Sequence, residues 1–167
     1  MIRRTLFVLL FSVVAAACAS DITAPEPSLD GLPEGLSVSL TVAPGQVNQH
    51  GSFTVQLDVT NTTDEIIRVV TSHGCLAIPN VLRDGKRIPF KGSSWGCTAA
   101  ITTHTLPPGE TRLRTWEMRA ELYAEHAGDV DGAAAPKGLY RVQAEFDTVP
   151  KSGNLQKPTI EQDLRVR

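Results

Sequence analysis

The sequence predicts an all-β protein, an immunoglobulin-like antiparallel β-sandwich of seven to eight strands. Three observations lead to this prediction: segments in which apolar and polar residues alternate, turn residues at regular intervals between them, and almost no helical pattern. Alternation with a period of two is what a strand shows when one face meets a core and the other meets water. Because crossover helices are lacking, a parallel α/β sheet is excluded and a sandwich is the economical architecture.

The clearest strand is predicted for residues 52–61, which we expect at the centre of a sheet. Odd-numbered positions in this segment are apolar and even-numbered positions are polar. The apolar residues are Phe53, Val55, Leu57 and Val59. We expect the rest of the chain to cover this apolar face. The following Asn61-Thr62-Thr63 is formally a glycosylation sequon, but its composition predicts a turn.

The remaining strands are predicted along the whole chain. They cover residues 36–43, 66–71, 81–83, 86–88, 111–118, 138–146 and 159–167. Residues 66–71 are apolar enough for a central strand. Pro44-Gly45 ends the first of these strands, and Asp84-Gly85 is a two-residue hairpin signal. Tyr140 stands where a tyrosine corner would bind the backbone at the head of a late strand.

Two neighbouring segments have a less regular pattern. In residues 111–118 the alternation slips, because Leu113 and Trp116 differ in parity, and this predicts a bulge or an edge position. Residues 117–127 are rich in Glu, Met, Ala and Leu and predict a short helix. A mobile loop is expected after it, over residues 128–136.

The N-terminal segment predicts export. Residues 1–17 contain two arginines, then an apolar run, then three alanines, which is the order of a secretory signal. The apolar run is too short to span a bilayer core of about 30 Å. Cys18 follows directly, and the segment resembles a bacterial lipobox, so lipidation at Cys18 is expected. Cleavage by the ordinary signal peptidase, after Ala17 or Ala19, is the alternative.

These features divide the chain into three parts. Residues 1–17 are a signal peptide, and residues 18–35 are a lipidated N-terminus with a flexible tether rich in proline, acidic and small residues. Residues 36–167 form one β-sandwich domain. The expected location is the bacterial cell envelope, at the outer membrane or its periplasmic face, with the membrane reached through the lipid anchor.

The charge of the mature chain excludes one class of partner. After loss of the two signal arginines, 14 basic residues face 18 acidic ones, a net charge of −4. No basic stripe is present that could meet phosphates, so nucleic acid is not an expected partner.

Two further cysteines, Cys75 and Cys97, are expected to form a disulfide because export places them in an oxidising compartment. A closed loop of this size stabilises the fold by about 3 kcal/mol in the chain-entropy model. The alternative is a metal site that adds His73 and His104 to the cysteines. His73-Gly74-Cys75 is not a recognised zinc spacing and no second close pair supports it, so no metal is expected.

Patterns associated with catalysis are also present, but their context does not fit. Residues 92–96 spell a nucleophile elbow, which requires a strand turning sharply into a helix. Residues 129–132 begin like a calcium loop, yet Tyr140 stands where the final acid is required. The histidines are dispersed and are expected at the surface or in turns: His50, His73, His104 and His126. We therefore expect no catalytic residue and no cofactor.

Four stretches, in this order, resemble the BsuPI family of intracellular proteinase inhibitors over roughly residues 50–147. They are residues 53–62, residues 81–86, residues 106–116 and residues 138–142. The resemblance implies an immunoglobulin-like sandwich and inhibition of a serine proteinase. This chain differs from the family in its predicted export, its predicted disulfide and its longer segment at residues 117–137.

Two functional hypotheses result. In the first, the domain binds and blocks a proteinase through a segment whose shape is set before binding. The candidate loop is residues 90–98, braced by the cysteines, with Trp95 as a rigid apolar anchor or, alternatively, as a cover for the disulfide. Its proposed contact residues are Phe90, Lys91, Ser93, Ser94 and Trp95. In the second hypothesis, the sandwich belongs to a structural or accessory lipoprotein and is displayed to another envelope component.

Overall fold

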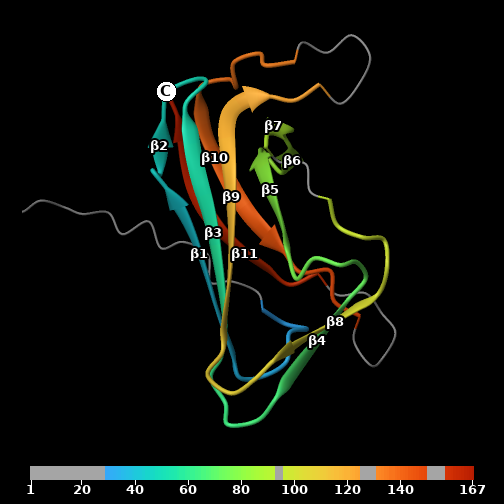
Figure 1. Ribbon diagram of the computed structural model, residues 1–167. Helices are drawn as coiled ribbons and strands as arrows, with labels where there is room; N and C mark the ends of the chain where they lie inside the picture. The colour runs from blue at the N-terminus through green and yellow to red at the C-terminus, as the bar shows by residue number, and fades with distance from the viewer. Residues whose placement is uncertain (1–28, 93–95, 125–130, 150–156) are drawn as a thin grey trace, which may run out of the picture.

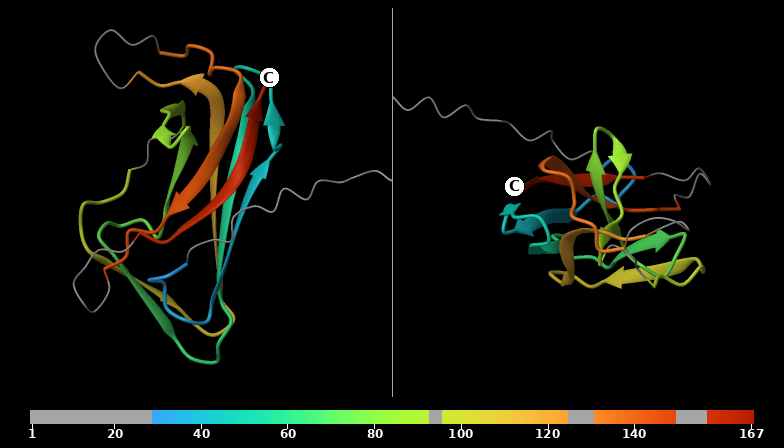
Figure 2. Two further views of the ribbon diagram at one scale, coloured as in Figure 1. Left: turned by 180° about the vertical axis from the view of Figure 1, so that it is seen from behind. Right: turned by 90° about the horizontal axis from the view of Figure 1, so that it is seen from above.

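The computed structural model describes residues 29–92, 96–124, 131–149 and 157–167, and every regular element among them is a β-strand. Two sheets pack face to face, as Figures 1 and 2 show. No helix long and apolar enough to cross a membrane occurs within these ranges. The predicted signal peptide and Cys18 lie outside them.

The strands form two main sheets and one two-stranded ribbon. The first sheet has the order β1 (Leu36–Ala43), β3 (Ser52–Asn61), β9 (Thr111–Leu122) and β7 (Phe90–Lys91). The second has the order β2 (Gln46–Val47), β11 (Thr159–Val166), β10 (Gly138–Glu145), β5 (Ile78–Arg83) and β6 (Lys86–Arg87). The ribbon pairs β4 (Ile67–Thr71) with β8 (Thr102–Leu106).

This arrangement is that of an immunoglobulin-like sandwich. The first sheet corresponds to the layer formed by immunoglobulin strands A, B, E and D, and β5, β10 and β11 correspond to strands C, F and G of the other layer. β2 pairs in parallel with β11, while the other strand pairs among the described residues are antiparallel. Eight of the described strands have five or more residues, so the predicted number is confirmed.

The alternation in β3 produces the core, as predicted. Its four apolar side chains are buried, while the intervening residues are exposed or half-buried. β3 lies between β1 and β9, with Leu57 opposite Leu40 and Phe53 opposite Met118. Alternate residues of the second sheet close the core from the other side. These are Tyr140, Val142 and Ala144 of β10, and Ile160, Leu164 and Val166 of β11.

The helix predicted for residues 117–127 is wrong over its described part. β9 continues through Leu122, with Arg119 opposite Ser52 of β3 and Leu122 opposite Phe90 of β7. The Leu122 N–H also donates to the Ala133 carbonyl at 2.7 Å. Because ladder hydrogen bonds reach this segment from both sides, they override its weak helix propensity.

The pattern slip in residues 111–118 reflects an edge position without a bulge. The register from Thr111 to Arg119 against β3 is continuous, and β7 is too short to cover the other side of this part of β9. Leu113 points outward and is 57% exposed. The inward positions at this end include Arg112, which donates to the Thr105 carbonyl of β8 at 2.6 Å.

The central position predicted for residues 66–71 is also wrong. β4 leaves the bottom of the first sheet and turns back as one half of the β4–β8 ribbon (Figure 1). Asn61 stabilises the bend, since its buried amide donates to the carbonyls of Glu65 at 2.7 Å and Leu106 at 2.9 Å and accepts from the Thr63 N–H. The sequon is therefore turn chemistry, as predicted.

Two other local predictions are confirmed. Asp84 and Gly85, with φ of 51° and 74°, form the turn between β5 and β6. This left-handed pair is the geometry that a two-residue hairpin requires. The Tyr140 hydroxyl donates to the Pro136 carbonyl and makes the tyrosine corner at the start of β10.

The predicted tether differs from the structure at its end. Residues 29–35 lie against the domain, where Leu32 packs on the core and the Gly35 carbonyl accepts hydrogen bonds from the N–H and the hydroxyl of Thr62, each at 2.8 Å. The ordered domain therefore begins before residue 36, because an apolar side chain and a backbone carbonyl find partners there.

Candidate functional site

A groove of about 480 Å³ lies on the outer face of the first sheet, at the end where β3 begins. Its floor and walls come from the end of β1, the start of β3, β7 and the middle of β9. The lining residues are Ala43, Pro44, Ser52, Phe53, Thr54, Lys91, Gly92, Glu117, Met118 and Arg119. Neighbouring strands bring them together, since Ala43 pairs with Thr54 and Thr54 pairs with Glu117.

One wall of the groove is the start of the candidate loop. Phe90 is fully buried, and its ring makes edge contacts with Phe53 at 6.0 Å and Tyr140 at 5.1 Å between centroids. Phe90 is therefore a core residue and is not available to a partner, which corrects its place among the proposed contact residues. The candidate loop therefore begins with a residue that is fixed in the core.

Gly92 brings the candidate loop against β9. Its φ is +86°, and a Cβ at this position would lie 2.4 Å from the Glu117 carbonyl oxygen and 3.3 Å from the Met118 Cα. Both neighbours are backbone atoms that cannot move aside easily. A glycine is thus required at this position for conformation and for space.

A buried carboxylate organises the charges beside the groove. Glu121 is almost fully buried at the end of β9, and its oxygens lie 2.6 Å from Arg119 Nη2, 3.4 Å from His50 Nδ1 and 3.8 Å from Lys91 Nζ. Lys91 also lies 3.7 Å from Asp131. The two cations on the rim, Lys91 and Arg119, are therefore held in place while their side chains remain about half exposed.

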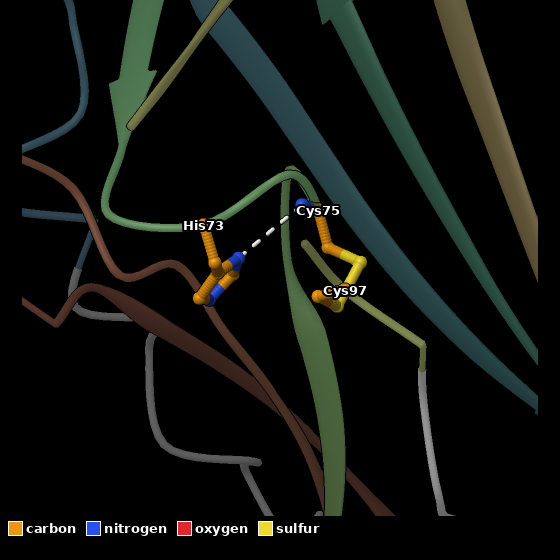
Figure 3. A group of neighbouring side chains, drawn as sticks. All are labelled: His73, Cys75 and Cys97. Carbon is orange, nitrogen blue, oxygen red and sulfur yellow. Dashed lines mark hydrogen bonds between the residues drawn. A yellow bond between two sulfur atoms is a disulfide. The ribbon is translucent and has the colours of Figure 1, made fainter. Parts of the chain in front are cut away.

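The predicted disulfide is present and closes the other end of the candidate loop (Figure 3). Cys75 and Cys97 join the segment after β4 to the segment before β8. Next to them, the Gly74 N–H donates to the Thr98 carbonyl at 2.9 Å. A Cβ on Gly74 would lie 2.2 Å from Thr98 Oγ1, so the two segments are in close contact.

The other proposed contact residues divide into two groups. Lys91 lies on the groove and is accessible. Ser93, Ser94 and Trp95 lie outside the described residues. The two roles considered for Trp95, anchor for a partner or cover for the disulfide, therefore stay predictions.

His104 contradicts the expectation of a surface histidine. It lies in β8, is 7% exposed, and its Nε2 is 3.1 Å from the Thr71 hydroxyl. Burial lowers the pKa of His104 below its ordinary value, and the charges of Arg112, Arg114 and His73 lower it further. The ring is a buried, structural component of the ribbon.

Asp84 and His104, an acid and a histidine near the elbow pattern in the sequence, lie on different strand pairs, and Ser93 and Ser94 lie outside the described residues. Asp84 is at the tip of the β5–β6 hairpin with its carboxylate 92% exposed, whereas His104 is buried in the β4–β8 ribbon (Figure 1). Asp131, from the segment that resembles a calcium loop, pairs with Lys91. Residues 129 and 130 of that segment lie outside the described ranges.

Sequence reasoning missed most of the groove. Arg119 and Glu121 fall in the predicted helix, and Glu117 falls where that helix overlaps the predicted strand over residues 111–118. No periodic signal identifies Pro44 or Thr54 as neighbours of Lys91. The only available signal was the run of charged residues on alternate positions 117, 119 and 121, which is the pattern of a strand with one face toward water.

No protein-family model matches this chain, and neither does any curated protein. Among solved structures, the chain is similar to a β-glucosidase from Listeria innocua (16% identity, TM-score 0.44), the β-glucosidase EmGH1 from Erythrobacter marinus (19%, 0.43) and the CARDB domain of PF1109 from Pyrococcus furiosus (15%, 0.42). The alignments cover 78%, 79% and 79% of this chain and 16%, 15% and 94% of those chains. The chain spans about one sixth of each glucosidase, and no activity follows from likenesses this distant.

Proposed function

We propose that this protein is a non-enzymatic protein-binding domain of the cell envelope, anchored through a lipid at Cys18, and that the groove and the candidate loop bind a segment of a partner. A serine proteinase is the first partner to test, in keeping with the resemblance to the BsuPI family. The observation that carries the proposal is that the candidate loop is anchored at both ends beside an open groove.

Fixing both ends of the candidate loop lowers the entropic cost of binding a partner. Phe90 is buried between two aromatic rings at the start of the loop, and Cys97 is bonded to Cys75 near its end. A segment whose ends are held before the partner arrives loses less conformational freedom on binding. Pre-organisation of this kind is what an inhibitory or recognition loop requires.

The chemistry of the groove suits a polar peptide segment. Ser52 and Thr54 offer hydroxyls on the floor, while Lys91, Arg119 and Glu117 offer charges of both signs on the walls. An extended peptide laid along the groove would find hydrogen-bond partners for its backbone and ion pairs for its side chains.

The position of the groove suits a lipid-anchored domain. β1 begins at Leu36, directly after the docked residues 29–35, and ends at the groove with Ala43. Its eight residues span about 26 Å. An anchor on the N-terminal side would thus hold the groove at the far end of the first sheet from the tether. The same geometry suits the second candidate, an accessory lipoprotein that displays the sandwich to another envelope component.

The test is a titration of the purified full chain against a panel of serine proteinases. We expect at least one proteinase to lose activity at about one equivalent, and we expect Lys91→Ala and Trp95→Ala to weaken this inhibition about tenfold or more. Arg165→Ala, on an exposed position of β11 in the other sheet, is the matched control and should inhibit as the unmodified chain does.

Two outcomes would contradict parts of the proposal. An intact chain that leaves every proteinase rate unchanged would refute inhibition and leave the accessory lipoprotein as the function to pursue. The mass of the mature N-terminus tests the anchor separately, and a chain that begins at an unmodified Ser20 would refute lipidation.

A further inference from the structure

We propose that the protein has a second, redox-dependent state in which Cys75, Cys97 and His73 bind a thiophilic metal ion such as Zn²⁺ in place of the disulfide. The site does not depend on the proposed binding function. Three potential ligands from two segments already converge there, and the segments are held together by contacts other than the S–S bond.

The donor atoms are close enough for one metal ion. One ring nitrogen of His73 and the sulfurs of Cys75 and Cys97 all lie within 4.8 Å of one another. In a tetrahedral zinc site, with bonds of about 2.0–2.3 Å, the ligand atoms are about 3.3–3.8 Å apart. Opening the S–S bond and shifting the imidazole by about an ångström would satisfy this geometry. All three residues are partly exposed, so a reductant and a metal ion can reach them.

The frame around these ligands does not require the disulfide. The backbone bond from the Gly74 N–H to the Thr98 carbonyl, at 2.9 Å, joins the two segments directly. The missing side chain of Gly74 lets Thr98 approach closely. The Thr71 hydroxyl donates to the His73 carbonyl at 2.6 Å and fixes the backbone of the third ligand. After reduction, the two thiols and the imidazole therefore remain neighbours.

The His73 ring has hydrogen-bonding capacity that the folded chain does not use. Its Nδ1 accepts one long hydrogen bond, 3.3 Å, from the Cys75 N–H, and the ring lies beside the disulfide (Figure 3). Its Nε2 is buried and has no hydrogen-bond partner among the described residues. Buried orphan nitrogens are rare, and an imidazole held this weakly can turn to offer either nitrogen to a metal.

The change of state balances as a thiol–disulfide exchange followed by metal binding. A dithiol reductant supplies two electrons and two protons, the S–S bond breaks, two S–H bonds form, and the reductant closes to its own disulfide. Zn²⁺ then displaces the two thiol protons and binds two thiolates and the His73 nitrogen, with water in the fourth position. The metal ties the same two segments as the disulfide, so the candidate loop stays anchored in both states.

The test uses the full chain with Cys18→Ser, in which Cys75 and Cys97 are the remaining cysteines. The chain is reduced with dithiothreitol, freed of reductant without air and titrated with Co²⁺, whose thiolate bonds and tetrahedral geometry give characteristic absorption. We expect one Co²⁺ per reduced chain, displaced by Zn²⁺, and none for the oxidised chain. His73→Asn retains an acceptor for the Cys75 N–H but is a poor ligand, and it should bind on the order of 100-fold more weakly.

Four results would overturn the site. The first three are a reduced chain with no cobalt–thiolate absorption, equal metal affinity in His73→Asn, and a reduced chain that unfolds, by circular dichroism, and stays unfolded when Zn²⁺ is added. The double variant Cys75→Ser/Cys97→Ser should bind no Co²⁺ in the same assay, and metal binding by this variant would count against the site as well.

Discussion

At the scale of single residues, two side-chain environments have consequences that can be measured. One is Gly92, where the missing side chain lets the start of the candidate loop lie close against the backbone of β9. The other is His104, a buried imidazole in β8 of the β4–β8 ribbon. Both act on the free energy of unfolding, and each has a distinct experimental signature.

Gly92→Ala should destabilise the fold by about 2–4 kcal/mol, because the new methyl meets the Glu117 carbonyl oxygen while the backbone keeps a positive φ. Gly109→Ala is the matched control. Gly109 also has a positive φ, +70°, but nothing lies within 4 Å of its missing Cβ, so about 1–2 kcal/mol is expected. Urea unfolding measures both values. Equal losses in the two variants would contradict the close approach at Gly92.

His104 should make stability depend on pH. Burial lowers the pKa of the folded His104, while the unfolded histidine titrates near its ordinary pKa of about 6.5. Below that pH the unfolded chain takes up a proton that the folded chain does not, so the free energy of unfolding falls as the pH falls from about 7 toward the folded pKa. This contribution to stability is fully present above pH about 6.5.

The check is urea unfolding at several pH values between about 7.5 and 5, with His104→Gln beside the unmodified chain. The variant should lose part of the decline in stability on acidification. Acidic groups titrate in both proteins, so the difference between the two curves isolates His104. Parallel curves would show that His104 does not contribute.

At the scale of elements, the tyrosine corner at the start of β10 makes contacts with strands of both sheets. Tyr140 is buried, its ring contacts Phe90, and its hydroxyl donates to Pro136 and lies 3.4 Å from Arg83 Nη1. One residue thereby joins the start of β10, the core next to the candidate loop and the end of β5.

Tyr140→Phe should cost about 0.5–1.5 kcal/mol, because the hydrogen bond to the Pro136 carbonyl is lost while the packing of the buried ring is unchanged. Tyr123→Phe is the control, since Tyr123 is half exposed. Thermal or urea unfolding of both variants gives the comparison. If Tyr140→Phe were as stable as Tyr123→Phe, the corner hydrogen bond would make no net contribution to the free energy of unfolding.

In β9, pairing with neighbouring strands determines whether a segment forms a helix or a strand. Residues 117–122 have side chains common in helices, yet β3, β7 and residues 133–135 all offer backbone partners there. Each ladder bond satisfies a polar group that would otherwise be unpaired at the edge of the core. Helix propensity differs by only about 0.7 kcal/mol among ordinary residues and cannot compete with this pairing.

At the scale of the whole molecule, the disulfide joins segments that are 22 residues apart in the sequence. Cys75→Ser/Cys97→Ser should lower the free energy of unfolding by about 3 kcal/mol, mainly because the unfolded chain regains the freedom of the closed loop. Urea unfolding of the oxidised chain and the double variant measures this. If the partner binds to the candidate loop, the double variant should also bind the partner more weakly. An unchanged unfolding midpoint would mean that the remaining contacts between the two segments suffice.

Like the disulfide, the groove is formed by segments that are distant in the sequence. Its walls come from residues near 43, 53, 91 and 118, which are distant in the sequence and are brought together by the pairing of β1, β3, β9 and β7. The candidate loop could be proposed from the sequence because a cysteine and a tryptophan stand close together. The groove beside it could not.

The sequence alone determined which residues of β3, β10 and β11 face the core, where the Asp84-Gly85 turn falls, which cysteines pair, and that Tyr140 closes a corner. Each of these is local: alternation, turn conformation and residue type act over a few positions. Only the tertiary structure decided that residues 117–122 extend a strand, that β4 leaves the main sheet, that Phe90 is buried and that His104 is buried beside Thr71. The physical reason is that these outcomes depend on register between distant strands, where pairing and burial outweigh local preference.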